Sequence, residues 1–135
     1  MKATQEWHQL VWFSQGLPHY SFITWLAIRD RLATGARMRS WGLFQPCLLC
    51  GEPNETRDHI FFACMFSFML WIGVAMLLLG RRNSLDWSRT LLSLSPATYN
   101  LTDYTLLRFC FQAVIYHLWR ERNRRKHQQW RHSYH

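Results

Sequence analysis

Residues 47–64 read CLLCGEPNETRDHIFFAC, and the rest of the chain can be arranged around them. Their spacing, C-x2-C-x8-H-x4-C, brings four soft or borderline ligands into eighteen residues. In a reducing compartment cysteines spaced in this way indicate a metal site before disulfides, and the ligand set is that of a closed tetrahedral zinc site. The sequence therefore predicts one structural Zn²⁺ ion, held by Cys47, Cys50, His59 and Cys64. The alternative is a set of reduced thiols in an apolar core.

The two halves of this motif place different demands on the backbone. A single tight turn can present Cys47 and Cys50 to one metal ion. His59 and Cys64 are five residues apart, which separates them by about 140° around a regular α-helix. We therefore expect His59 at a helix cap or first turn, or a distorted turn between the two ligands. Regular helix is expected only after Cys64.

Composition and charge bound the class of protein. The chain has 135 residues, 49% of them hydrophobic and 18% charged, which suits one folded domain with a core. Residues 101–135 contain seven Lys or Arg against two acidic residues, which gives +5 of the net charge of +8. This local basic charge favours polyanionic partners. The N-terminal residues lack the apolar run of a secretory signal peptide, so we expect an intracellular protein, nuclear or cytoplasmic and not secreted.

Residues 60–79, IFFACMFSFMLWIGVAMLLL, form an apolar run that permits two interpretations. Twenty apolar residues match the length of a transmembrane helix, and the arginines that follow suit its cytoplasmic flank. However, the run begins one residue after His59 and contains Cys64, so a metal site built on both would be drawn into the bilayer. We therefore favour a wholly buried central helix on which the other helices pack. A single membrane span is the alternative.

Helical periodicity and turn residues predict a mainly α fold, a small helical domain around a structural zinc knuckle with an irregular Cys-rich loop. Thr34 is a candidate N-cap and Gly42 a left-handed stop for one short helix. The expected helices cover residues 6–14, 21–32 (or from Pro18), 34–41, 58–79, 84–94 and 102–130. We expect residues 1–100 to form the zinc-binding domain. Residues 101–135 are expected to form a C-terminal helix, packed on the same domain, with a solvated basic tail.

The residues that flank the ligands resemble a known family. In order along the chain they are Phe22, Trp25, Arg31, Leu32, Thr34, Trp41, Gly42, Cys47, Leu49, Cys50, Glu55, Thr56, His59, Phe61, Cys64 and Trp71. This series, over about residues 7–71, resembles the zinc-binding domain that follows the polymerase in reverse transcriptases of plant non-LTR (LINE-type) retrotransposons. Gly35-Ala36-Arg37 departs from the family, which usually has a more polar, acidic turn there, and we expect a weaker helix cap.

The resemblance implies an upstream reverse transcriptase and sometimes a downstream RNase H, but this chain carries the motifs of neither. A two-metal polymerase or nuclease site needs convergent carboxylates. The chain has one close acidic trio, within the segment 46–64 that we name the cysteine loop: Glu52, Glu55 and Asp58. Four protein ligands would also leave zinc no open position for a substrate. We therefore expect no enzymatic activity.

The expected function is a zinc-binding module that assists RNA or DNA binding. Phosphate contacts are expected from Arg57 in the cysteine loop and from the basic tail, at Arg120, Arg122, Arg124, Arg125 and Lys126. The tryptophans, at helical spacing beside aliphatic residues, are expected mostly in the core and not stacked on bases. A protein-interaction or relic domain without a nucleic-acid role is the alternative. No small-molecule substrate is expected, and the oligomeric state is left open.

Overall fold

A computed structural model describes residues 8, 10–14, 16–74 and 101–133. The described helices are α2 (Pro18–Ile28), α3 (Gly35–Arg39), α4 (Met65–Val74) and α7 (Leu101–Ser133), with the π-helical turn η1 (His59–Ala63) before α4. No strand occurs within these residues. The predicted mainly α fold is confirmed, whereas the helix expected at residues 84–94 lies outside the described part of the chain.

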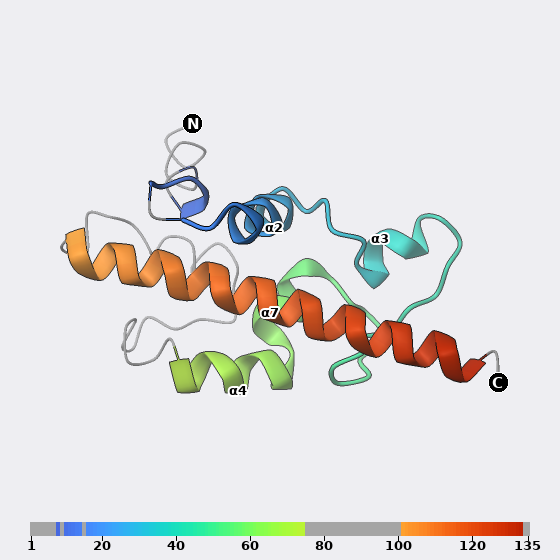
Figure 1. Cartoon of the computed structure of the whole chain (residues 1–135). Coiled ribbons are helices and arrows are strands. Elements are labelled where there is room, and N and C mark those ends of the chain that lie inside the picture. Colours follow the sequence, from blue (N-terminus) through green and yellow to red (C-terminus); the bar gives the residue numbers. More distant parts are fainter. Residues whose placement is uncertain (1–7, 9, 15, 75–100, 134–135) are drawn as a thin grey trace.

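Helix α7 is the axis of the molecule. It runs along the whole structure, with α2 and α3 on one side and α4 on the other (Figure 1), and it packs against α2, α4 and η1. One stripe of α7, at helical spacing, is buried: Leu107, Phe111, Val114, Ile115, Leu118 and Trp119. The prediction of a helix over residues 102–130 is confirmed. Leu106, next to this stripe, is exposed.

The expectation that residues 60–79 form a wholly buried central helix is wrong. Cys64 has extended backbone, with ψ of 135°, and this residue separates η1 from α4. α4 presents only one side to α7, so it buries Trp71 but exposes Met65 and Met69. Within the described residues, no helix is both long enough and apolar enough to cross a bilayer. The last five residues of the apolar run lie outside that part of the chain.

Helix α2 begins and ends at residues whose chemistry explains the boundary. It begins at Pro18, the alternative to the expected start at residue 21, and it has no side-chain cap. Proline suits the first helical position because the N–H that it lacks would have no partner there. The helix ends at Ile28, four residues earlier than expected, because Asp30 adopts a positive φ of 54°. The Arg31 N–H then donates to Leu26 O (2.8 Å) and closes the helix end.

Helix α3 has the expected cap and stop. Thr34 Oγ1 accepts a hydrogen bond from the Arg37 N–H (3.3 Å), and Gly42, after the helix, has φ of +80°. The departure from the family at Gly35 has a packing reason, because a Cβ at this position would lie 2.0 Å from Gln45 O. Glycine therefore lets the backbone of α3 touch the cysteine loop, while Thr34 supplies the cap.

Gln112 ties the N-terminal segment to α7. Residues 8, 10 and 11 are helical, within the helix expected over residues 6–14. The buried Gln112 side chain donates through Nε2 to the carbonyl oxygens of Leu10 (2.8 Å) and Val11 (2.9 Å). Carbonyl groups at the end of a helix have no partner within it. α7 therefore completes the hydrogen bonding of this N-terminal turn.

Candidate metal centre

The four predicted ligands converge at one point. Their donor atoms, three sulfurs and one imidazole nitrogen, all lie within 4.8 Å of one another. The Sγ atoms of Cys47 and Cys64 are 3.9 Å apart, and Cys50 Sγ lies 3.2 Å from His59 Nε2. Zinc–sulfur bonds of about 2.3 Å at tetrahedral corners place two sulfurs about 3.8 Å apart. The separation of the Cys47 and Cys64 sulfurs therefore suits two thiolates on one zinc ion, and the four donor atoms together could hold one metal ion.

A tight backbone turn presents the first two ligands. The Gly51 N–H donates to Cys47 O (2.8 Å), and the Cys47 N–H donates to Glu52 O (2.8 Å). These two bonds close the turn around Cys50. Gly51 has φ of +89°, a left-handed conformation that favours glycine. Backbone hydrogen bonds, without helix or strand, therefore set the positions of the first two sulfurs.

A π-helical turn brings the second pair of ligands together. In η1 the Cys64 N–H donates to His59 O (2.7 Å), which is the bond between residues i and i+5 that defines a π-helix. Because the turn spans five residues, the two ligands meet on one side, whereas a regular α-helix would hold them about 140° apart. The prediction of a distorted turn, with regular helix only after Cys64, is confirmed. Thr56 Oγ1 accepts from the His59 N–H (3.1 Å) and caps the turn.

The break between η1 and α4 leaves carbonyl groups that need other partners. Ser67 Oγ donates to Ile60 O, and Trp71 Nε1 donates to Phe61 O (2.6 Å). All four residues are buried, where an unpaired carbonyl group would cost free energy. Ser67 and Trp71 therefore hold the irregular segment that carries the second ligand pair.

Burial shifts the pKa values of the ligands Cys47 and His59 before a metal binds. Desolvation of the thiolate raises the pKa of Cys47 to about 12. Burial lowers the pKa of His59, so its imidazole is neutral at neutral pH and has a lone pair for a metal. A divalent cation supplies the positive charge that buried thiolates require, and its binding releases their protons.

A comparison with protein families agrees with this geometry. The family model described as zinc-binding in reverse transcriptase matches residues 1–71, just over half of the chain. The chain belongs to this family. The match is to a zinc-binding domain and not to a polymerase or RNase H domain. The resemblance carried by the ligands and their flanking residues is thus confirmed at the level of the family. Comparisons with curated proteins and with solved structures find no match.

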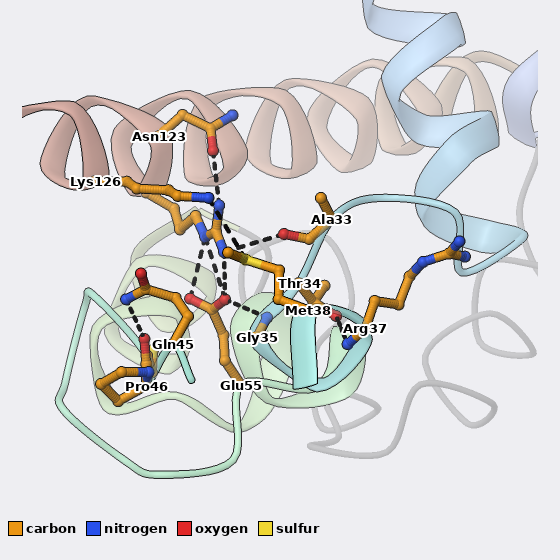
Figure 2. Close-up of polar contacts among 12 residues, drawn as sticks. Ala33, Thr34, Gly35, Arg37, Met38, Gln45, Pro46, Glu55, Asn123 and Lys126 are labelled. Atoms are coloured by element: carbon orange, nitrogen blue, oxygen red, sulfur yellow. Dashed lines mark hydrogen bonds and ion pairs between the residues drawn. The ribbon is translucent and has the colours of Figure 1, made fainter. Parts of the chain in front are cut away.

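A buried ion pair joins the region that matches the reverse transcriptase zinc-binding family to α7, which lies outside the match. Arg122 Nη2 is 2.6 Å from Glu55 Oε1, and the two side chains are 1% and 0% exposed. Arg122 Nε also donates to both carboxylate oxygens of Glu55, at 3.2 and 3.1 Å. Glu55 Oε1 accepts in addition from the Gly35 N–H (2.7 Å), at the start of α3 (Figure 2). One carboxylate in the cysteine loop therefore fixes both α3 and α7.

The guanidinium group of Arg122 makes two further hydrogen bonds to oxygen atoms. Nη1 donates to Asn123 Oδ1 (2.9 Å), and Nη2 donates to Ala33 O (3.1 Å). The guanidinium carbon lies 4.7 Å from the centroid of the Trp119 ring. Complete pairing of this kind makes a buried charge tolerable. The expectation that Arg122 contacts phosphates from a solvated tail is therefore corrected, because its side chain lies inside the domain.

The other arginines predicted in the basic tail lie at or near the surface of α7. Arg120 is exposed. Arg124, 55% exposed, pairs with Glu121 at 2.6 Å. Arg125 pairs with the same carboxylate at 3.2 Å and also donates to Leu48 O (3.3 Å), between the first two cysteines. We define the basic face of α7 as Arg120, Arg124 and Arg125.

Lys126 and Arg57, also predicted to contact phosphates, are both partly engaged within the protein. Lys126 Nζ lies 3.5 Å from Met38 Sδ, and burial lowers the pKa of this lysine. Arg57 Nη1 donates to Ile28 O (3.0 Å), and its Nε pairs with Asp58 at 3.3 Å. These two side chains therefore hold neighbouring segments together as well as carrying positive charge.

Proposed function

We propose that the chain is a non-catalytic module, derived from the reverse transcriptase of a plant non-LTR retrotransposon, in which one structural zinc ion holds the cysteine loop. The observation that carries the zinc assignment is the convergence of four donor atoms within 4.8 Å in a member of this family. Cys47, Cys50, His59 and Cys64 would hold the ion. Four protein ligands complete a tetrahedral shell, as in structural zinc sites. When bound, the ion cross-links the loop.

The proposed role of the module is to assist the binding of RNA or DNA through the basic face of α7. The three arginines of this face and Lys126 carry four positive charges, and Glu121 carries one negative charge. Together they have a net charge of +3. Phosphate contacts from such a surface are largely independent of sequence and mainly electrostatic. We therefore infer a supporting role in nucleic-acid binding, without base recognition by this face.

A groove between α4 and α7 lies beside the basic face and supports this proposal. Its volume is about 490 Å³. Three charged residues of α7 line it, Arg120, Glu121 and Arg124, together with His117. The apolar part of the lining comes from both helices: Phe66, Leu70 and Leu118. A groove with this mixed lining suits a nucleic-acid strand, whose phosphates are charged and whose bases and sugars have apolar surfaces.

Salt dependence tests the electrostatic part of the proposal. Binding of the zinc-loaded chain to single-stranded RNA, single-stranded DNA and duplex DNA is measured by fluorescence anisotropy between about 50 and 200 mM salt. The Arg120→Gln/Arg124→Gln variant is expected to bind all three more weakly. Its slope of log K against log salt should fall by about 1.4 on single strands, because each phosphate contact contributes about 0.7. Arg122 is left unchanged because its loss would destabilise the fold.

A matched variant removes the same charge elsewhere. Arg29→Gln/Arg31→Gln changes two exposed arginines at the end of α2, and it is expected to keep more of the wild-type affinity and slope. Equal losses in the two double variants would mean that only net charge matters. A wild-type interaction that does not respond to salt would contradict the electrostatic role.

A protein-interaction role is the second candidate, and α4 is the observation that favours it. This helix exposes four large apolar side chains: Met65, Phe66, Met69 and Ile72. Exposed apolar surface of this kind marks many protein interfaces. If the folded, zinc-loaded chain binds no nucleic acid even at low salt, this candidate replaces the first.

A further inference from the structure

The turn between α3 and the first cysteine displays three large apolar side chains to solvent. Trp41 is 57% exposed, Leu43 54% and Phe44 70%, and we name these three residues the aromatic turn. A single exposed apolar residue needs no explanation, but a contiguous group in a small domain indicates a partner. The expectation that the tryptophans lie mostly in the core does not hold for Trp41.

The backbone of the aromatic turn is fixed by the folded domain. The Leu43 N–H donates to Met38 O (3.0 Å), and the Gly42 N–H donates to Arg39 O (3.0 Å). Gly42 adopts φ of +80°, which lets the chain reverse after α3. Met38 is buried and so anchors the turn. Because the turn is already ordered, a ligand would lose little affinity to ordering its backbone.

Two arginines of α3 lie against the exposed rings. The guanidinium carbon of Arg37 is 5.8 Å from the centroid of the Trp41 ring, and that of Arg39 is 5.9 Å from the Phe44 centroid. Both distances are within the range of cation–π interactions. The aromatic turn therefore pairs each exposed ring with a neighbouring positive charge.

The charges of these two arginines are held in place by neutral acceptors. Arg37 Nη1 donates to Asp30 O (2.7 Å), and Arg39 Nη1 donates to Asn54 Oδ1 (2.8 Å). Arg39 Nη2 donates to Pro53 O (3.0 Å). Within the described residues, no carboxylate forms an ion pair with either arginine. Among the described residues, both guanidinium groups are thus oriented without an ion-paired carboxylate, which favours an anionic partner.

A cleft beside Trp41 extends this charged surface. Its volume is about 310 Å³, and its lining combines Arg37 and Arg57 with one acidic residue, Asp30, and with four short side chains, three of them hydroxylic: Thr34, Ala36, Ser40 and Thr56. Arg37 both lines the cleft and lies against the Trp41 ring. An anionic group in the cleft would therefore lie close to a ligand stacked on that ring.

We propose that the aromatic turn, with Arg37 and Arg39, is a stacking platform for the bases of single-stranded nucleic acid. This inference rests on the proposed nucleic-acid role and adds to it a second surface with a preference for unpaired strands. Exposed rings stack on bases of any sequence, and guanidinium groups attract the phosphates between them. A duplex keeps its base faces inside its own stack, so it cannot use the platform. An uncharged apolar partner would bury both guanidinium groups without an anion, at a cost in free energy.

An abasic strand separates stacking from charge. Binding is measured by anisotropy for oligothymidine and for an abasic strand of equal length and charge, with the zinc-loaded wild type and the Trp41→Ala/Phe44→Ala variant. The wild type is expected to prefer oligothymidine by about tenfold, because stacking on protein rings strengthens single-strand binding by roughly this factor per base. The variant should lose this preference while keeping wild-type affinity for the abasic strand and for duplex DNA. Phe22→Ala, which removes an exposed ring of α2, should keep it.

The possible outcomes separate this inference from the nucleic-acid role itself. If the wild type binds the two strands equally, the platform is overturned while the electrostatic role stands. If the wild type binds neither strand, both fail. Binding of the wild type but not the variant to vesicles of zwitterionic lipid, with no preference for oligothymidine, would assign the turn to a membrane surface and overturn the platform. Zinc content and circular dichroism of each variant verify that the substitutions, all at exposed positions, leave the fold intact.

Discussion

Removing the metal with a chelator is expected to unfold the cysteine loop, residues 46–64. Structural zinc contributes roughly 10–16 kcal/mol in peptides, as much as the whole stability of about 5–15 kcal/mol of a typical domain. The turn around Cys50 depends most on the metal, because only two backbone bonds close it and Arg125 adds one contact, to Leu48 O. Hydrogen exchange measures the effect. The amides of Cys47, Gly51 and Cys64 bond across the loop and η1, and their protection should fall by about a thousandfold or more, ~4 kcal/mol of opening free energy.

The amides in the middle of α7, around Gln112 and Ile115, provide the internal reference for this experiment. They lie in the buried stripe of a 33-residue helix, so they should lose less protection than the loop. Unchanged hydrogen exchange at the amides of Cys47 and Gly51, in protein shown to contain no metal, would contradict a structural role for zinc.

The Arg122→Ala substitution is expected to lower the free energy of unfolding by about 3–5 kcal/mol. Removing one partner of a buried pair leaves the other charge uncompensated, and Glu55 is 0% exposed. The loss would also free the Ala33 carbonyl and loosen the contact of α7 with the cysteine loop. Denaturant unfolding of the zinc-loaded protein measures the change.

Two variants make this prediction specific to the buried pair. Arg124→Ala removes the exposed pair with Glu121 and should cost far less than Arg122→Ala, because solvent screens surface ion pairs and they contribute little. Arg122→Met combined with Glu55→Gln removes both charges but keeps an acceptor for the Gly35 N–H, so it should be clearly more stable than Arg122→Ala. Equal effects of Arg122→Ala and Arg124→Ala would show that the buried pair has no special weight.

The metal centre could be predicted from the sequence because its determinants are local. Cys47 and Cys50 are close enough for one turn, and the five-residue spacing of His59 and Cys64 conflicts with regular helix geometry. That conflict is resolved in the structure by the π turn of η1. The helix starts and stops that were predicted correctly, such as Thr34, are also set by interactions within a few residues.

The parts that sequence reasoning missed depend on contacts between distant segments. Glu55 and Arg122 are 67 residues apart, and the charge pattern around Arg122 is the same as that of a solvated tail. Glu55 stands out in the sequence as a carboxylate near the ligands and as one of the residues that carry the family resemblance, but neither observation reveals its partner. The ligand spacing indicates a distorted turn before Cys64, but the sequence does not reveal how the break is stabilised, by the side chains of Ser67 and Trp71 in the following helix.

The zinc content of the purified chain tests the central claim most directly. We predict one equivalent of zinc per chain by elemental analysis, bound through Cys47, Cys50, His59 and Cys64. Cys64→Ser should lose most of it, while Cys110→Ser, which changes the one cysteine outside the cluster, should retain the full equivalent. A folded wild-type chain without zinc, or a Cys64→Ser variant that keeps one equivalent, would contradict the assignment.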